Sequence, residues 1–161
     1  MTDTRRFSLA GASAAADKGD DEIARWVGDF LASRGSDNAV LAAALAQAQH
    51  WWFGPVQIPV VDLERLAGPE DDALCDVDPD DWEEDVESMH ESLAAGWEPP
   101  PLLAEWQDGR LLLQDGNHRY EALVREDAAY AWTLVYFPTL ADRDQFAAQY
   151  LEEIRVSGRR P

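Results

Sequence analysis

Five consecutive residues near the middle of the C-terminal half combine side chains that can do chemistry. They are Asp115, Gly116, Asn117, His118 and Arg119. A carboxylate accepts hydrogen bonds, an imidazole can donate or accept them, and a guanidinium presents a rigid set of donors that matches a phosphate group. Gly116 allows the backbone to turn sharply or to approach a ligand closely. These residue types therefore favour a site for a phosphate or a nucleotide.

The residues around this cluster predict a strand, a tight turn and a helix. Residues 111–113 are an apolar run, and an apolar stripe continues in a predicted helix over residues 117–126. The backbone N–H groups and the dipole at the start of that helix suit an anion. We expect Arg119 to bind phosphate, and the alternative is that it pairs with Asp115 or Glu121.

Two other residues of the cluster have a chemical and a structural interpretation. His118 would contact phosphate or act as an acid or base, or it would brace the turn by hydrogen bonds. Asp115 would be a functional carboxylate, or it would serve as a turn former or helix cap. Gly116 is required by the backbone in either case.

Hydrophobic periodicity along the chain predicts an α+β fold, with a small mixed sheet and flanking helices, preceded by an N-terminal helical hairpin. We expect three parts: a disordered tail over 1–19, the hairpin over 20–54 and the main domain over 55–157. Within the main domain, strands are predicted at 56–60, 102–106, 110–114 and 130–137, and helices at 82–93, at 117–126 and from Pro138 onward. Leu63 and Leu66 suggest a helical turn, and Asp108-Gly109 predicts a tight hairpin turn.

The aromatic stretch over residues 49–53 has two interpretations. Its side chains would pack the helical hairpin onto the sheet, as large aromatic residues do in protein cores. Alternatively, they would form a stacking wall for the base or sugar of a ligand. The role of His50 follows the same choice.

Residues 70–87 form an acidic block, in which eleven of eighteen side chains are Asp or Glu and none is basic. Asp76, Asp78, Asp80 and Glu87 match four positions of a calcium-binding loop, but Asp81 replaces the glycine that the loop requires. A solvated loop that caps the following helix is the other interpretation.

The overall charge argues against nucleic-acid binding. The chain of 161 residues has 32 acidic and 13 basic side chains, for a net charge of −19. Proteins bind nucleic acids largely by neutralising phosphates with Lys and Arg. The paired arginines at 5–6 and 159–160 lie far apart in sequence, so we expect no direct DNA binding. An acidic surface of this kind instead suits a basic protein partner.

Cysteine content and apolar runs limit the protein class further. One cysteine, Cys75, allows neither an internal disulfide framework nor a cysteine-based zinc cluster. No apolar run has the length of a membrane span. Residues 4–9 resemble a twin-arginine export signal, but the stretch that follows is short and weakly apolar. A cytoplasmic protein that does not associate with membranes is therefore expected.

The chain resembles the ParB/sulfiredoxin superfamily over residues 56–137. The resemblance lies in the Asp-Gly-Asn-His-Arg turn after a strand, together with an entry strand at 56–63, an acidic amphipathic helix at 82–93 and a proline-containing strand entry at 98–103. In this superfamily the turn opens a helix and holds nucleotide phosphates. Asn117 occupies the place of the catalytic cysteine of sulfiredoxins, and an amide cannot act as that nucleophile, so sulfinic-acid repair is not expected. ParB-type DNA clamps have further domains for which this chain leaves no room.

The turn resembles most closely the stand-alone branch of the superfamily, which includes nucleotide-dependent small-molecule kinases. The resemblance implies binding of ATP or another nucleotide by Gly116, Asn117, His118 and Arg119, with Mg²⁺ to offset phosphate charge. His118 and Asp115 would be catalytic and act on a small-molecule substrate. A further base or metal ligand would come from the helix that follows the acidic block, where the candidates are Glu83, Glu84, Asp85 and Glu87.

A second function stays open from the sequence. The domain would be a non-catalytic interaction module whose acidic surface meets a basic protein partner, with seven Trp residues available for an interface. A positive, concave pocket at Arg119 would favour the nucleotide. An Arg119 side chain held by a neighbouring carboxylate, with no cavity beside it, would favour the interaction module. A nuclease is the least favoured alternative, because the turn lacks clustered metal-binding carboxylates and the chain lacks a basic groove.

Overall fold

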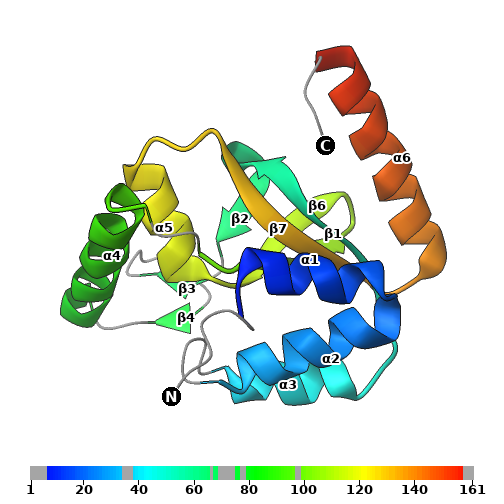
Figure 1. The fold of residues 1–161 in the computed structure, drawn as a ribbon, viewed down its shortest axis with the longest axis horizontal. Helices are drawn as coiled ribbons and strands as arrows, with labels where there is room; N and C mark the ends of the chain where they lie inside the picture. Colours follow the sequence, from blue (N-terminus) through cyan, green and yellow to red (C-terminus); the bar gives the residue numbers. More distant parts are fainter. Residues whose placement is uncertain are drawn as a thin grey trace.

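The computed structural model describes residues 7–33, 38–65, 67–68, 75–76, 79–96 and 99–157. A five-stranded mixed sheet with the order β1-β7-β5-β6-β2 forms its centre (Figure 1). The strands of this sheet are β1 (Trp51–Pro59), β2 (Leu63–Arg65), β5 (Leu102–Gln107), β6 (Arg110–Asp115) and β7 (Tyr130–Phe137). The remaining elements are α1 (Leu9–Asp17), α2 (Asp20–Leu31), α3 (Ala39–Ala46), the 3-10 helix η1 (Val60–Asp62), the paired strands β3 (Ala67–Gly68) and β4 (Cys75–Asp76), α4 (Pro79–Ala94), α5 (Asn117–Arg125) and α6 (Leu140–Ser157).

Both kinds of strand pairing occur in the sheet. The pairs β1–β7 and β5–β6 are antiparallel, whereas β5–β7 and β2–β6 are parallel. Asp108 and Gly109 join β5 to β6, and both have positive φ angles, of 52° and 81°. Asp-Gly suits such a tight turn because both residues tolerate positive φ. The predicted hairpin is therefore confirmed.

Alternation along the central strands gives the sheet two buried faces. On one face, Leu102 and Val135 pack with α6 and with the apolar side of α5. On the other face, Leu103, Leu134 and Tyr136 pack with α1 and α2. Strand β7 is covered on both faces, which explains the nearly continuous apolar run in its sequence. The sequence predicted such a buried strand. The α+β class, the mixed sheet with flanking helices and the preceding pair of helices are all confirmed.

The N-terminal region differs from the expected disordered tail. Residues 9–17 form α1, and Ala12 in this helix is fully buried. The Ser8 hydroxyl caps the helix by accepting a hydrogen bond from the Gly11 N–H at 3.1 Å. The alanines of α1 have high intrinsic helix propensity, and Phe7 just before it packs on Trp26 and Phe30 of α2. An alanine-rich helix lacks a strong apolar period, so periodicity did not reveal it.

The segment before the predicted first strand also differs from expectation. Strand β1 begins at Trp51, and it pairs with the whole of β7. Pairing along this length satisfies backbone groups of the buried strand β7 that would otherwise lack partners. Trp52 is buried between α2 and the sheet, which agrees with the packing interpretation of the aromatic stretch. Residues 63–65, where a helical turn was expected, form the edge strand β2.

The core beneath α1 and α2 joins the predicted hairpin region to the sheet, so we expect the described parts to unfold together. Ile23 on α2 is 1% exposed within that core, and Ile23→Val should lower the free energy of unfolding by about 0.5–1.5 kcal/mol. Urea unfolding followed by both fluorescence and circular dichroism would measure this change. Val40→Ala is the control, because Val40 is 84% exposed and should leave stability unchanged. Two separate transitions, with only one of them shifted by Ile23→Val, would contradict the expectation.

Candidate functional site

The turn between β6 and α5 brings the five candidate residues together as the sequence predicted. Strand β6 ends at Asp115, Gly116 adopts a left-handed conformation with φ 99° and ψ 26°, and α5 begins at Asn117. No side chain of the described residues caps the start of α5. A Cβ atom at position 116 would lie 2.6 Å from Cδ2 of Leu102 and 2.9 Å from Nη2 of Arg119. Glycine is therefore required both by the backbone angle and by the close approach of two side chains.

Arg119 and Asp115 form a buried ion pair inside this turn. Nη2 of Arg119 donates to Oδ2 of Asp115 at 3.0 Å, and their side chains are 6% and 9% exposed. The same nitrogen lies 3.5 Å from the Pro101 carbonyl oxygen, whereas the Nε–H of Arg119 has no acceptor among the described residues. The structure thus places Arg119 in the Asp115 pairing that was the alternative to phosphate binding. The phosphate contact itself stays a prediction.

Two residues from the N-terminal helices complete the surroundings of the ion pair. Nδ2 of Asn38, just before α3, donates to Oδ1 of Asp115 at 3.3 Å. The ring of Phe30 on α2 lies under the Arg119 guanidinium, with 5.3 Å from Cζ to the ring centroid. Sequence reasoning missed both residues, because nothing in the local pattern links them to a turn about eighty positions later. Contacts from the N-terminal helical region therefore hold the turn in place, although the two are far apart in sequence.

His118 points away from the buried pair and toward α4. Its ring lies 4.5 Å from the Trp82 ring, and Nε2 lies 3.6 Å from Oδ2 of Asp85. Burial lowers the pKa of His118, and the positive charge of Arg119 adds to this effect, while Asp85 and Asp115 oppose it. Arg65 lies over Trp82 on the same stack, 5.0 Å from the ring centroid. His118 is thus half-buried and favours its neutral form.

A pH dependence of stability follows from the lowered pKa of His118. The unfolded chain binds a proton at a higher pH than the folded protein does, so folding stability should fall as the pH drops from the usual histidine value of 6.5 toward the folded pKa. We expect His118→Gln to lose less stability than wild type between about pH 8 and pH 5. Urea midpoints across this range would measure it. His90 and the carboxylates are common to both proteins, so equal slopes would contradict the expectation.

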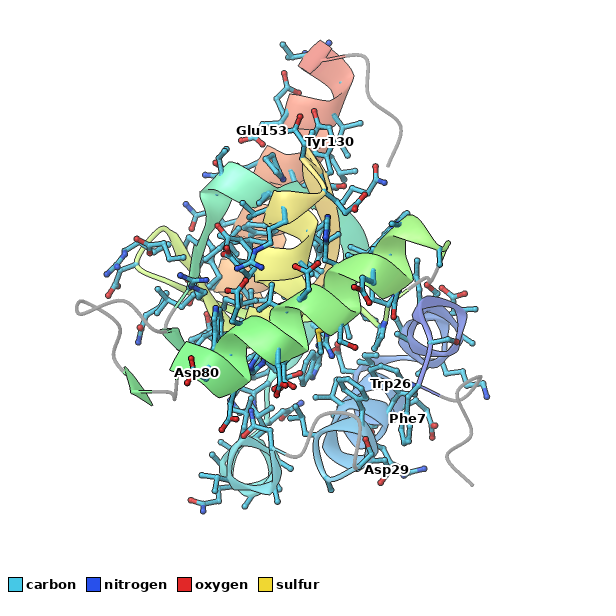
Figure 2. All side chains as sticks on the ribbon, turned by 90° about the vertical axis from the view of Figure 1, so that its left-hand side faces the viewer. Phe7, Trp26, Asp29, Asp80, Tyr130 and Glu153 are labelled. Atoms are coloured by element: carbon cyan, nitrogen blue, oxygen red, sulfur yellow. The ribbon has the colours of Figure 1, made fainter. Side chains whose placement is uncertain are left out.

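Helix α4 lies across α5 and carries the four carboxylates considered as a base or metal ligand (Figure 2, where Asp80 marks the start of α4). Glu83 accepts two hydrogen bonds from Arg125 at 2.8 Å, which lowers its pKa. Glu87 lies 3.6 Å from the same guanidinium. Glu84 is exposed, and Asp85 is the member of the four that lies within 4.0 Å of a turn residue, His118. Most of the acidic face of α4 therefore serves the contact between α4 and α5 or faces solvent.

In the described part of the chain, the turn coincides neither with a cluster of metal ligands nor with one of four surface hollows. Among the residues that the structure describes, no three His, Cys, Asp or Glu side chains are arranged to hold a metal ion. Asp78 of the calcium-loop pattern lies outside the described residues. Four surface hollows of about 380–700 Å³ are lined by residues other than 115–119. These hollows therefore give no cavity at Arg119.

Comparison with known proteins gives a similarity of fold. Solved structures that match the chain include the crystal structure of sulfiredoxin from Arabidopsis thaliana, with a TM-score of 0.40 and 19% sequence identity. The match covers 50% of this chain and 81% of that chain. No protein-family model and no curated protein matches the sequence. The similarity concerns the fold alone and extends over half of this chain.

Within the described part of the chain, we find no helix with the length and apolarity needed to cross a bilayer.

Proposed function

We propose that this protein is a non-catalytic interaction domain whose acidic surface binds a basic partner protein. The observation that carries the proposal is the Asp115–Arg119 ion pair, in which the two side chains of opposite charge in the turn bind each other. A buried arginine that already has a carboxylate partner offers little charge to an incoming phosphate. In this role the turn positions α5 between the sheet and α4.

The surface charge supports the same proposal. The net charge of −19 would repel a nucleotide and attract a basic protein. Several acids that are at least partly exposed have no basic partner among the described residues, Glu105, Asp108 and Asp142 among them. Complementary charge mainly increases the rate of association and excludes wrong partners. A partner rich in Arg and Lys therefore fits this surface best.

Peptides of matched length and opposite charge would test this function. We expect the full chain to bind arginine- or lysine-rich peptides in fluorescence anisotropy, with affinity that falls as salt is raised. Neutral and acidic peptides should not bind. If no basic peptide binds at about 0.15 M salt, the proposed function is wrong.

Nucleotide binding at residues 115–119 is the second candidate, and the start of α5 favours it. The helix follows a left-handed glycine and has no side-chain cap within the described ranges, so the N–H groups of its first turn suit a phosphate. His118 beside them is half-exposed and could contact the anion. Asp85 would be the nearest candidate for a base or for a Mg²⁺ ligand. A phosphotransferase of small molecules would require these groups to act together.

Thermal stability measured with ATP, ADP, CTP and GTP in the presence of Mg²⁺ would test the second candidate. A nucleotide at about one hundred times its dissociation constant should add about 2.7 kcal/mol of stability. His118→Ala is the informative variant, because Arg119 also holds the fold. A rise in melting temperature in wild type that is lost in His118→Ala would establish the nucleotide site. No rise with any of the four would rule it out for these nucleotides.

A further inference from the structure

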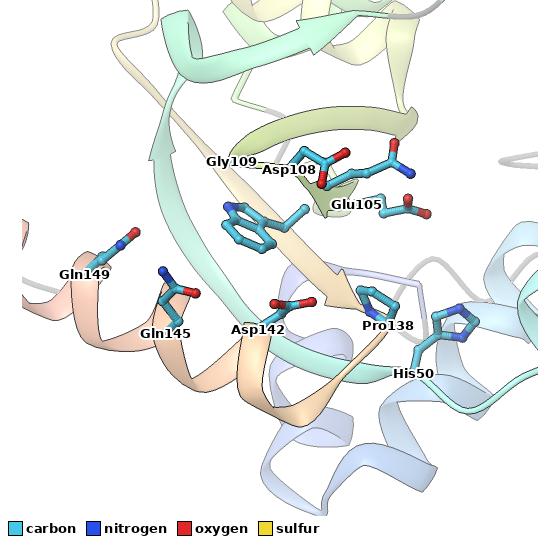
Figure 3. Close-up of a pocket in the computed structure, with 10 residues that line it drawn as sticks. His50, Glu105, Asp108, Gly109, Pro138, Asp142, Gln145 and Gln149 are labelled. Atoms are coloured by element: carbon cyan, nitrogen blue, oxygen red, sulfur yellow. The ribbon is translucent and has the colours of Figure 1, made fainter.

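A groove runs beside α6, between that helix and the turn that joins β5 to β6. Two hollows of about 700 and 380 Å³ form it, and both are lined by Trp106, Gly109 and Gln149. We call this feature the Trp106 groove. Figure 3 shows the larger hollow, with Asp108 and Gly109 on one side and Asp142 of α6 on the other. Such volumes are typical of ligand-binding clefts.

The two walls of the larger hollow have different origins. Asp142, Gln145 and Gln149 follow one another at helical spacing, so they lie on one side of α6 and face the hollow (Figure 3). Trp106 comes from β5, and its ring packs on Phe137 with 6.2 Å between the centroids. The hollow therefore combines a fixed aromatic ring with carboxylate and amide groups on a rigid helix.

The larger hollow is acidic, and His50 is the one lining residue that can carry a positive charge. Its lining includes the carboxylates of Glu105, Asp108 and Asp142, and no Lys or Arg. Among the described residues, no basic nitrogen lies within 4.0 Å of these carboxylates. Burial raises the pKa of Tyr136, and the charge of Glu105 raises it further. The Tyr136 hydroxyl therefore stays protonated.

The smaller hollow continues this character. It adds Asp62, Glu64 and Glu153 and one cation, Arg110. Arg110 donates to both oxygens of Glu64, at 2.7 and 3.1 Å, so its charge is already compensated. The whole groove thus presents an excess of carboxylates around Trp106, and an anionic ligand would be repelled along its length.

We propose that the Trp106 groove binds an arginine-containing basic segment of a partner protein. The proposal rests on the proposed function and specifies where on the surface the partner binds. A guanidinium stacks on an indole face and pairs with carboxylates, and the larger hollow offers Trp106 together with Asp108 and Asp142. Two neighbouring hollows that share Trp106, Gly109 and Gln149 suit an extended segment with more than one basic side chain.

The test uses the full chain and fluorescein-labelled arginine-rich, lysine-rich and neutral peptides of equal length, with anisotropy at about 0.15 M salt. The groove variant is Asp108→Asn/Asp142→Asn. Its matched control is Glu84→Gln/Glu91→Gln, which removes the same charge from exposed positions on α4. Trp106→Leu keeps apolar bulk in the wall but removes the indole face. Circular dichroism of each variant confirms that it is folded.

We expect the groove variant and Trp106→Leu each to weaken binding of the arginine-rich peptide by about tenfold. The α4 control should change it by less than about twofold. If the groove variant and the α4 control weaken binding equally, the Trp106 groove is not the binding site. The proposed function would remain in place, because binding would then depend on overall charge. Failure of wild type to bind any basic peptide would overturn both.

Discussion

Arg119→Ala is expected to lower the free energy of unfolding by about 3–5 kcal/mol, because it leaves the buried Asp115 carboxylate without its cation. The loss includes the packing of the guanidinium on Phe30. Asp115 keeps the hydrogen bond from Asn38, which does not neutralise its charge. Urea unfolding of wild type and variant at neutral pH would measure the change.

Three comparisons separate the buried charge from lost packing. The cost of Arg119→Ala should shrink at acidic pH, because protonation removes the charge of a carboxylate that has lost its partner. Combining Asp115→Asn with Arg119→Met should recover part of the stability, since a neutral pair needs no counter-charge. Arg155→Ala is the matched control, because Arg155 pairs with Glu152 on the exposed side of α6 and should cost less than about 1 kcal/mol. If Arg119→Ala also loses less than about 1 kcal/mol, the expectation that the buried ion pair is important for stability is wrong.

Gly116→Ala is expected to destabilise the fold by about 2–5 kcal/mol. A left-handed conformation costs an alanine about 1–2 kcal/mol, and overpacking adds about 1–3 kcal/mol. The overpacking arises because the new methyl group would lie 2.6 Å from Leu102 and 2.9 Å from Arg119. Relief of the second contact would displace Arg119 from Asp115. The free energy of unfolding in urea is again the measurement.

Gly96→Ala provides a matched control for the backbone term. Gly96 has a φ of 96°, close to the 99° of Gly116, and a Cβ atom there would meet no atom of the described residues within 4 Å. Its substitution should therefore cost only the conformational part, about 1–2 kcal/mol. The difference between the two variants isolates the steric contribution. Equal losses would show that the contacts around Gly116 relax without cost.

Elements with a strong local pattern could be predicted from the sequence. The continuous apolar run of β7, the Asp108-Gly109 turn and the apolar stripe that begins at Trp82 each depend on nearby residues. Helix α1 was missed because its alanines show no apolar period. The first residues of β1 were missed because their pairing is decided by β7, far along the chain. Long-range pairing of this kind leaves little trace in a local window.

The same distinction applies to the candidate site. The sequence identified the five residues of the turn, because a glycine between a strand and a helix carrying charged residues is a local pattern. It left open whether Arg119 faces a ligand or Asp115, since the covering by Phe30 and Asn38 decides this. The Trp106 groove was not predicted either, because its walls come from β5, the β5–β6 turn and α6. Their approach depends on the packing of α6 against the sheet.

The order of strands in the sheet has a consequence for folding during synthesis. The two outer strands, β1 and β2, come from one stretch of chain, residues 51–65, and their partners β7 and β6 both lie later in the sequence. While the ribosome has yet to release residues 110–137, neither outer strand has a neighbour with which to pair. Residues 51–65 therefore stay unpaired, with apolar side chains exposed, until the central strands are synthesised. A growing chain of this topology is most exposed to aggregation, and most in need of chaperones, during that interval.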